Sequence, residues 1–99
     1  MAIIIPAPAQ TITTFDVPGA PATFPLMIIP NGTVTGYYFD ASWLTHGFLR
    51  TPDGTITPFD APGALNGTTT PSSMNQAGTI VGFYRDAGRF PHGFLRDST

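Results

Sequence analysis

Two Asp–His pairs are the residues best suited to do chemistry. Asp40 precedes His46 by six residues, and Asp86 precedes His92 by the same spacing. Each pair flanks a segment that we expect to form a hairpin, so that the carboxylate and the imidazole can meet. Such a pair can act as a general base or as half of a metal site, or it can form a buried hydrogen bond that stabilises the sheet. Because a catalytic centre has no reason to be repeated, we expect two structural Asp–His locks.

The remaining side chains indicate no catalytic centre. The chain has no Glu and no Cys, and it contains no glycine-rich phosphate loop. No serine lies in a Gly-x-Ser-x-Gly motif. We therefore expect no enzyme activity, no cofactor and no metal. The serines are Ser42, Ser72, Ser73 and Ser98.

Charge pairs between neighbouring strands are the expected role of four further residues. Arg50 and Arg96 end the strand expected to begin at each histidine, and Asp16 and Asp60 end another expected strand. Opposite charges on adjacent strands stabilise a sheet modestly.

Aromatic side chains offer the better candidates for ligand binding. Trp43 lies between Asp40 and His46, and Arg89 and Phe90 lie in the corresponding segment near the C-terminus. A large rigid ring on an exposed loop can stack on a sugar at low cost in conformational entropy. We take Trp43, Tyr37, Arg89 and Phe90 as candidate residues for a carbohydrate-like ligand. The alternative is that Trp43 caps its sheet or packs at a subunit contact.

A tandem repeat positions all of these residues. Residues 11–20 and 55–64 share eight of ten residues, and the sequence His-Gly-Phe-Leu-Arg occurs at both 46–50 and 92–96. Self-similarity at this period is typical of propellers and solenoids. We divide the chain into an N-terminal arm (1–10), a first unit (11–54) and a second unit (55–99).

Composition and turn residues predict an all-β fold. Eleven Gly and eleven Pro separate short runs rich in β-formers, and no apolar pattern has the period of a helix. With 10% charged residues and a net charge of −2, nucleic acid is not an expected partner. No run is long enough to span a membrane. The expected strands lie near 11–15, 24–29, 33–39 and 46–50, and near 55–59, 70–75, 79–85 and 92–96.

The third strand of each unit is apolar or aromatic on both faces, which means that both faces should be covered. Two four-stranded antiparallel blades of a β-propeller, stacked face to face, satisfy this requirement. Gly36 and Gly82 would then permit close approach between sheets near the propeller axis.

Three motifs together resemble the HAF family of bacterial extracellular repeats. They are Phe-Asp-x-Pro-Gly-Ala, Gly-Thr-Ile-Val-Gly-Phe-Tyr at 78–84, and His-Gly-Phe-Leu-Arg. The resemblance covers about 11–96, and it implies propeller-like blades in an extracellular or cell-surface protein, with no catalytic residue to carry over. Unit one departs from the pattern at Ile29 and Pro30, where unit two has Asn75 and Gln76.

Two blades cannot close a ring, so we expect the chain to associate with itself. Three copies would supply six blades and four copies eight, both in the usual range for propellers. Residues 2–5 resemble a stray outer strand that could pair with a neighbouring copy. The expected function is a non-enzymatic, self-assembling repeat module, with a carbohydrate-like surface on each blade as an option. The alternative is a fragment of a larger extracellular propeller protein whose activity, hydrolytic for example, lies outside this chain.

Overall fold

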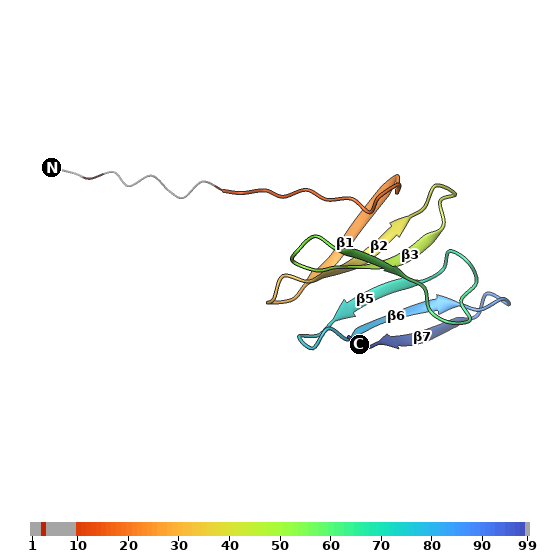
Figure 1. Cartoon of the computed structure of the whole chain (residues 1–99). Coiled ribbons are helices and arrows are strands. Elements are labelled where there is room, and N and C mark those ends of the chain that lie inside the picture. The colour runs from red at the N-terminus through yellow and green to blue at the C-terminus, as the bar shows by residue number, and fades with distance from the viewer. Residues whose placement is uncertain (1–2, 4–9, 99) are drawn as a thin grey trace.

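A computed structural model describes Ile3 and residues 10–98 as an all-β protein of two stacked antiparallel sheets (Figure 1). No helix occurs among these residues, so none of them forms a helix that could span a membrane. The strands are β1 (Ala22–Ile28), β2 (Val34–Phe39), β3 (Thr45–Arg50), β4 (Ile56–Phe59), β5 (Thr70–Met74), β6 (Ile80–Arg85) and β7 (Pro91–Arg96).

The first sheet has the strand order β1-β2-β3-β4, and every neighbouring pair is a hairpin. The loop from Thr51 to Thr55 shows why β4 pairs with β3. The amide of Thr51 donates to the carbonyl of Thr55, and Gly54 adopts a φ of 92° that favours glycine. A loop this tight returns the chain along the strand it has just left.

The second sheet has the order β5-β6-β7 and repeats the details of the first. In both sheets the first strand carries a β-bulge directly after a proline, Pro25 in β1 and Pro71 in β5. Proline lacks the N–H that a regular ladder requires, so a bulge accommodates it. The same irregularity therefore occurs at corresponding positions of the sequence repeat in the two sheets.

The sheet boundaries differ from the expected ones in two respects. Residues 56–59 were expected to open the second sheet, but they close the first one as β4. Residues 11–15, whose sequence is nearly the same, form no strand. In Figure 1 the start of this segment, drawn in red, leads away from both sheets. The expected strand at 2–5 lies outside the described residues, apart from Ile3. The described sheets therefore contain four and three strands, where four and four were expected.

The two sheets pack face to face and share a hydrophobic core. We call face one of each sheet the face that carries Val34 and Phe48 in the first sheet and their counterparts Ile80 and Phe94 in the second. Face two is the opposite face. Face two of the first sheet packs against face one of the second, and backbone approaches between the sheets are concentrated on β5. The core between the sheets comprises Ile29, Leu49, Phe59, Met74, Ile80 and Phe94.

Face one of the first sheet has a smaller core of its own. Val34 and Phe48 are buried there, and Val17 packs onto them from the segment that precedes β1. Phe15, Ala20, Tyr38 and Ile56 complete this cluster. The segment 15–20 thus covers the first sheet in part.

The expected role of the two central glycines is corrected by their surroundings. A Cβ atom on Gly36 would overlap the carbonyl oxygen of Phe24, and one on Gly82 would overlap that of Thr70. Those oxygens belong to the neighbouring strand of the same sheet, beside the bulge. The glycines therefore make room for the bulged strand, and their nearest neighbours are not on the other sheet.

Candidate functional site

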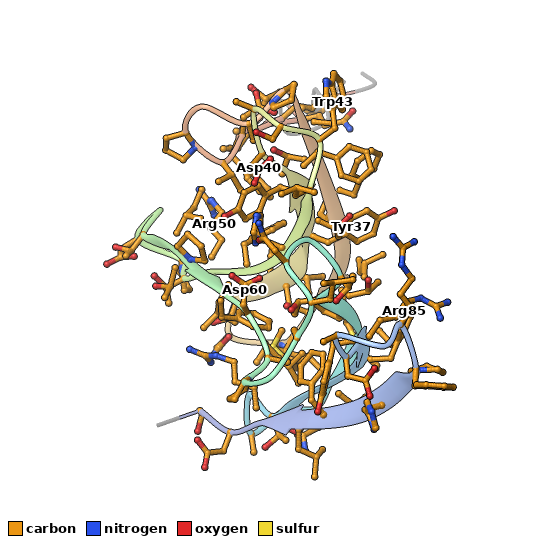
Figure 2. All side chains as sticks on the ribbon, turned by 90° about the vertical axis from the view of Figure 1, so that its right-hand side faces the viewer. Tyr37, Asp40, Trp43, Arg50, Asp60 and Arg85 are labelled. Atoms are coloured by element: carbon orange, nitrogen blue, oxygen red, sulfur yellow. The ribbon has the colours of Figure 1, made fainter. Side chains whose placement is uncertain are left out.

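The first Asp–His lock is a chain of three side chains at one end of the first sheet. The Nε2 atom of His46 lies 2.7 Å from Oδ2 of Asp40, and its Nδ1 atom lies 2.7 Å from Oδ1 of Asp60. Asp40 directly follows β2, His46 lies in β3 and Asp60 directly follows β4, so three adjacent strands supply the three groups. Figure 2 shows the two aspartates on the ribbon of the first sheet.

Local turn chemistry places Asp40 where it can bind the histidine. Its Oδ1 atom accepts hydrogen bonds from the amides of Ser42 and Leu44, at 2.8 and 3.0 Å. These bonds hold a turn in which Trp43 has a φ of 63°. One carboxylate oxygen therefore shapes the hairpin, and the other is left to bind His46.

The second lock repeats the first but holds the histidine on one side only. Asp86 accepts from the amides of Gly88 and Phe90, and its Oδ2 lies 2.8 Å from Nε2 of His92. No described residue binds Nδ1 of His92. The side chain of His92 is 47% exposed, whereas that of His46 is 14% exposed.

Hydrogen bonding shifts the ionisation of the first lock toward charged forms. Burial of His46 disfavours its protonated form, but hydrogen bonds to the carboxylates of Asp40 and Asp60 outweigh it and raise the pKa of His46 above 6.5. The hydrogen bond from His46, followed by that from the Leu44 amide, lowers the pKa of Asp40 below 3.8. In the second lock, His92 and the Phe90 amide lower the pKa of Asp86 in the same way.

This arrangement suits a structural role better than catalysis. A general base needs a free ring nitrogen within reach of its substrate, and both nitrogens of His46 are engaged by carboxylates. No group of three or more ligand side chains in the described part of the chain is placed to hold a metal. The expected burial is wrong in degree, because the carboxylate of Asp40 is 32% exposed.

Asp60 is the member of the lock that the sequence did not assign. Asp16 and Asp60 were expected to pair with Arg50 and Arg96, but no ion pair joins them among the described residues. Instead the guanidinium of each arginine lies over a phenylalanine ring, 4.9 Å from its centroid for Arg50 and 5.1 Å for Arg96. The signal that could have found Asp60 is the Asp53-Gly54 turn, because a tight hairpin there places the end of β4 beside the start of β3.

A shallow pocket of about 350 Å³ adjoins the first lock. Its walls are mostly apolar, and Asp40 and Tyr38 supply the ionisable groups. Burial, together with the negative charges of Asp60 and Asp40, raises the pKa of the Tyr38 hydroxyl. The lining residues are Val17, Pro18, Gly19, Ala20, Tyr38, Asp40, Ala41, Ile56 and Pro58.

The aromatic candidates fall into two groups. Trp43 begins a row of four rings that continues through Phe39 and Phe24 to Tyr37. The row folds back on itself, because the ring of Tyr37 also lies 6.2 Å from that of Phe39. Figure 2 labels Trp43 and Tyr37. The successive centroids are 6.0, 5.2 and 4.8 Å apart, and Trp43 is 64% exposed.

Arg89 and Phe90 lie on the corresponding hairpin of the second sheet. Arg89 has a φ of 68°, close to that of Trp43, and its carbonyl accepts from the guanidinium of Arg85. No ring contact or hydrogen bond joins either residue to the row of four rings within the described residues. The structure therefore places the four candidates on two separate hairpins.

The chain matches no family model, no curated protein and no solved structure in the comparisons made with each.

Proposed function

We propose that this chain is a non-enzymatic repeat module whose two sheets are consecutive blades of a β-propeller, and that it associates with further copies of itself to close the ring. One observation carries the proposal. Face two of the first sheet packs on face one of the second, so the stack ends in a face one at one side and a face two at the other. The two end faces are therefore of the same two kinds, face one and face two, as the inner faces that pack together between the sheets.

Exposure at the end faces supports this pairing. Met74 on face one of the second sheet is 2% exposed, but its counterpart Ile28 at the open end is 65% exposed. On face two, Thr35 is fully buried, whereas its counterpart Val81 is 40% exposed. Phe83 and Leu95 lie on the same open face and are also exposed. Apolar surface of this kind drives association.

The shape of the stack favours a ring over a flat pile. Because the close backbone approaches are concentrated on β5, the sheets are nearer at one edge than at the other. Repeating such a wedge turns each sheet relative to the last until the ring closes. Three or four copies, with six or eight blades, are the expected forms.

The resemblance to HAF repeats supports an extracellular or cell-surface setting for this module. The alternative proposal is a fragment of a larger extracellular propeller protein, whose neighbouring repeats would cover the same two faces. The full occupation of His46 by carboxylates favours a structural role for the first lock in either case.

Light scattering on the purified chain tests self-assembly. We expect a single species whose mass is three or four times the 10.5 kDa of one chain. A folded monomer would contradict self-assembly and favour the fragment.

A second function, the binding of a carbohydrate-like ligand, is favoured by the row of four rings. Trp43 is the only tryptophan in the sequence, so its fluorescence reports directly on that end of the row. We expect oligosaccharides to change this fluorescence in a saturable way. Tyr37→Ala should weaken binding by up to about tenfold, because stacking on one ring contributes about 0.5–1.5 kcal/mol. An unchanged spectrum at millimolar sugar would argue against the site.

A further inference from the structure

Resting on the proposed self-assembly, we propose that residues 12–15 of one copy form the missing outer strand of the second sheet in the next copy, beside β7. In this arrangement Asp16 of the donor copy binds Nδ1 of His92 in the acceptor copy. The second Asp–His lock is thus completed only by another copy of the chain.

The contact between β3 and β4 provides the template within a single chain. Gly47 pairs with Phe59 and Arg50 pairs with Ile56, and Asp60 directly after β4 binds Nδ1 of His46. The acceptor strand recurs 46 residues later as β7, and the donor sequence occurs 44 residues earlier at 12–15. Transferred to these positions, the same register pairs Gly93 with Phe15 and Arg96 with Ile12.

The acceptor edge is open in one chain. No described strand pairs with the second side of β7, and Leu95 is 74% exposed. Beside this edge lies a groove of about 310 Å³. Its counterpart on the first sheet is the place where Ile56 of β4 packs near Val17. The groove is lined by Phe59, Asp60, Ala61, Pro62, Phe94, Leu95, Arg96 and Asp97.

Gly93 has a use in this arrangement that it lacks in a single chain. A Cβ atom on its counterpart Gly47 would lie 2.6 Å from the ring of Phe59 and 3.0 Å from that of Pro71, so only glycine fits there. A Cβ atom on Gly93 would meet nothing closer than the carbonyl oxygen of Gly82 at 3.9 Å. By the repeat, Phe15 and Pro25 of the next copy would fill this space.

Most of the donor segment is exposed, but its last residue already packs on the first sheet of its own chain. Ile12 is 77% exposed, and Asp16 is exposed with no bond to a described residue. Phe15, however, packs against Phe48 of its own sheet with 6.0 Å between ring centroids. The ring of Phe59 packs against Phe94 of the second sheet in the same way, at 6.2 Å.

This double role is the one that β4 performs within the chain. That strand is hydrogen-bonded to the first sheet, and its terminal Phe59 packs on the second. A segment 12–15 paired with another copy's β7 would likewise bond to one sheet and pack on the next. The exchanged strand therefore covers the exposed edge and joins the open faces of two copies at once.

Two single substitutions block opposite sides of the proposed contact. Gly93→Ala places a methyl group where Phe15 of the donor must lie, so this variant keeps a working donor but loses its acceptor. Ile12→Asp puts a charge into the groove beside β7, so it keeps a working acceptor but loses its donor. Neither position is packed in a single chain, so we expect both variants to fold with the circular dichroism of the parent.

Light scattering at concentrations where the parent assembles then tests the contact. Each variant alone should be a monomer, and an equimolar mixture should form a heterodimer of twice the monomer mass and nothing larger. Thr13→Asp is the matched control. It carries the same charge on the other face of the strand, where its counterpart Thr57 is exposed, so it should retain the parent oligomer.

The outcomes separate this inference from self-assembly itself. If the parent is oligomeric and both variants keep its mass, the exchanged strand is wrong while self-assembly stands. If the parent is a monomer, both proposals fail. A homodimer formed by either variant alone would also overturn the exchanged strand, because it requires a contact that uses neither Gly93 nor Ile12.

Discussion

Both ring nitrogens of His46 are hydrogen-bonded to carboxylates. A protonated imidazolium, which donates one hydrogen bond to each carboxylate, satisfies this geometry best. His92 is the corresponding histidine at the same strand position, but only one carboxylate among the described residues binds it. The two locks therefore differ in strength although their sequences are alike.

Replacing the histidines with alanine should reveal this difference. We expect His46→Ala to lower the free energy of unfolding by about 1 kcal/mol, because it removes the donor shared by two carboxylates that solvent can also reach. His92→Ala should cost less in the monomer, since its ring is more exposed and bound once. Urea denaturation of monomeric protein measures both, and equal losses would contradict the unequal locks.

The pH dependence of stability follows from the shifted pKa values. Because the pKa of His46 is raised on folding, its contribution is complete below about 6.5 and is lost as pH rises through the folded-state value. Because the pKa of Asp40 is lowered, its contribution is present above about 3.8 and is lost as pH falls through the folded-state value. The network should therefore stabilise the fold most at mildly acidic pH.

Comparing the parent with His46→Gln isolates this network. We expect the difference in unfolding free energy to be largest at about pH 5 and to shrink toward about pH 9. A difference that stays constant over this range would show that the charge on His46 adds nothing.

At the scale of the elements, the repeat determines local geometry but not strand pairing. Residues 11–15 and 55–59 are nearly identical, yet only the second segment contributes a strand, β4. The β-rich pattern, the hairpins and the Asp–His spacing follow from local sequence and could be predicted. A strand also needs a free edge to pair with, and that partner is non-local. The segment 55–59 finds β3 beside it, whereas the open edge that matches 11–15, the second side of β7, lies on the other described sheet.

Asp60 escaped prediction for the same reason. The partner of Asp60 depends on which sheet β4 joins. The predicted boundary between the repeat units at residue 55 had placed this strand in the second sheet. Gly36 was expected to allow close approach between sheets, whereas its crowding arises within a sheet, from the bulge beside Pro25.

Gly36→Ala tests this account of the bulge. Its methyl group would overlap the carbonyl oxygen of Phe24, a backbone atom that cannot move without breaking the ladder. We expect a loss of at least about 2 kcal/mol in unfolding free energy. Gly93→Ala is the control, because its methyl group makes only an ordinary van der Waals contact with the carbonyl oxygen of Gly82 and should leave the monomer unchanged. Thermal denaturation at low protein concentration compares them, and an undamaged Gly36→Ala would remove the bulge as the cause.

At the scale of the whole molecule, the two equivalent aspartates should have opposite effects. Asp60→Ala removes half of the lock inside each chain, so it should lower the melting temperature of the monomer. Asp16→Ala should leave the monomer's melting temperature unchanged and raise the concentration needed for assembly by about tenfold, the equivalent of one charge-assisted hydrogen bond.

A dilution series followed by light scattering and melting curves separates the two effects. If Asp16→Ala destabilises the monomer as much as Asp60→Ala does, then Asp16 acts within its own chain.

The offset between repeat and sheet also bears on how such a chain can lengthen. A further copy of the 55–98 segment, added after residue 98, would begin with a strand that completes the sheet before it and would end with a new three-stranded sheet. Each duplication therefore covers one open strand edge and leaves a new one at the end of the chain. A longer chain of this kind would still need a partner for its last sheet. Moving residues 10–20 from the front of the chain to its end would instead yield two whole sheets in one polypeptide. In the protein made by such a rearranged gene, each sequence repeat would begin and end where a sheet begins and ends.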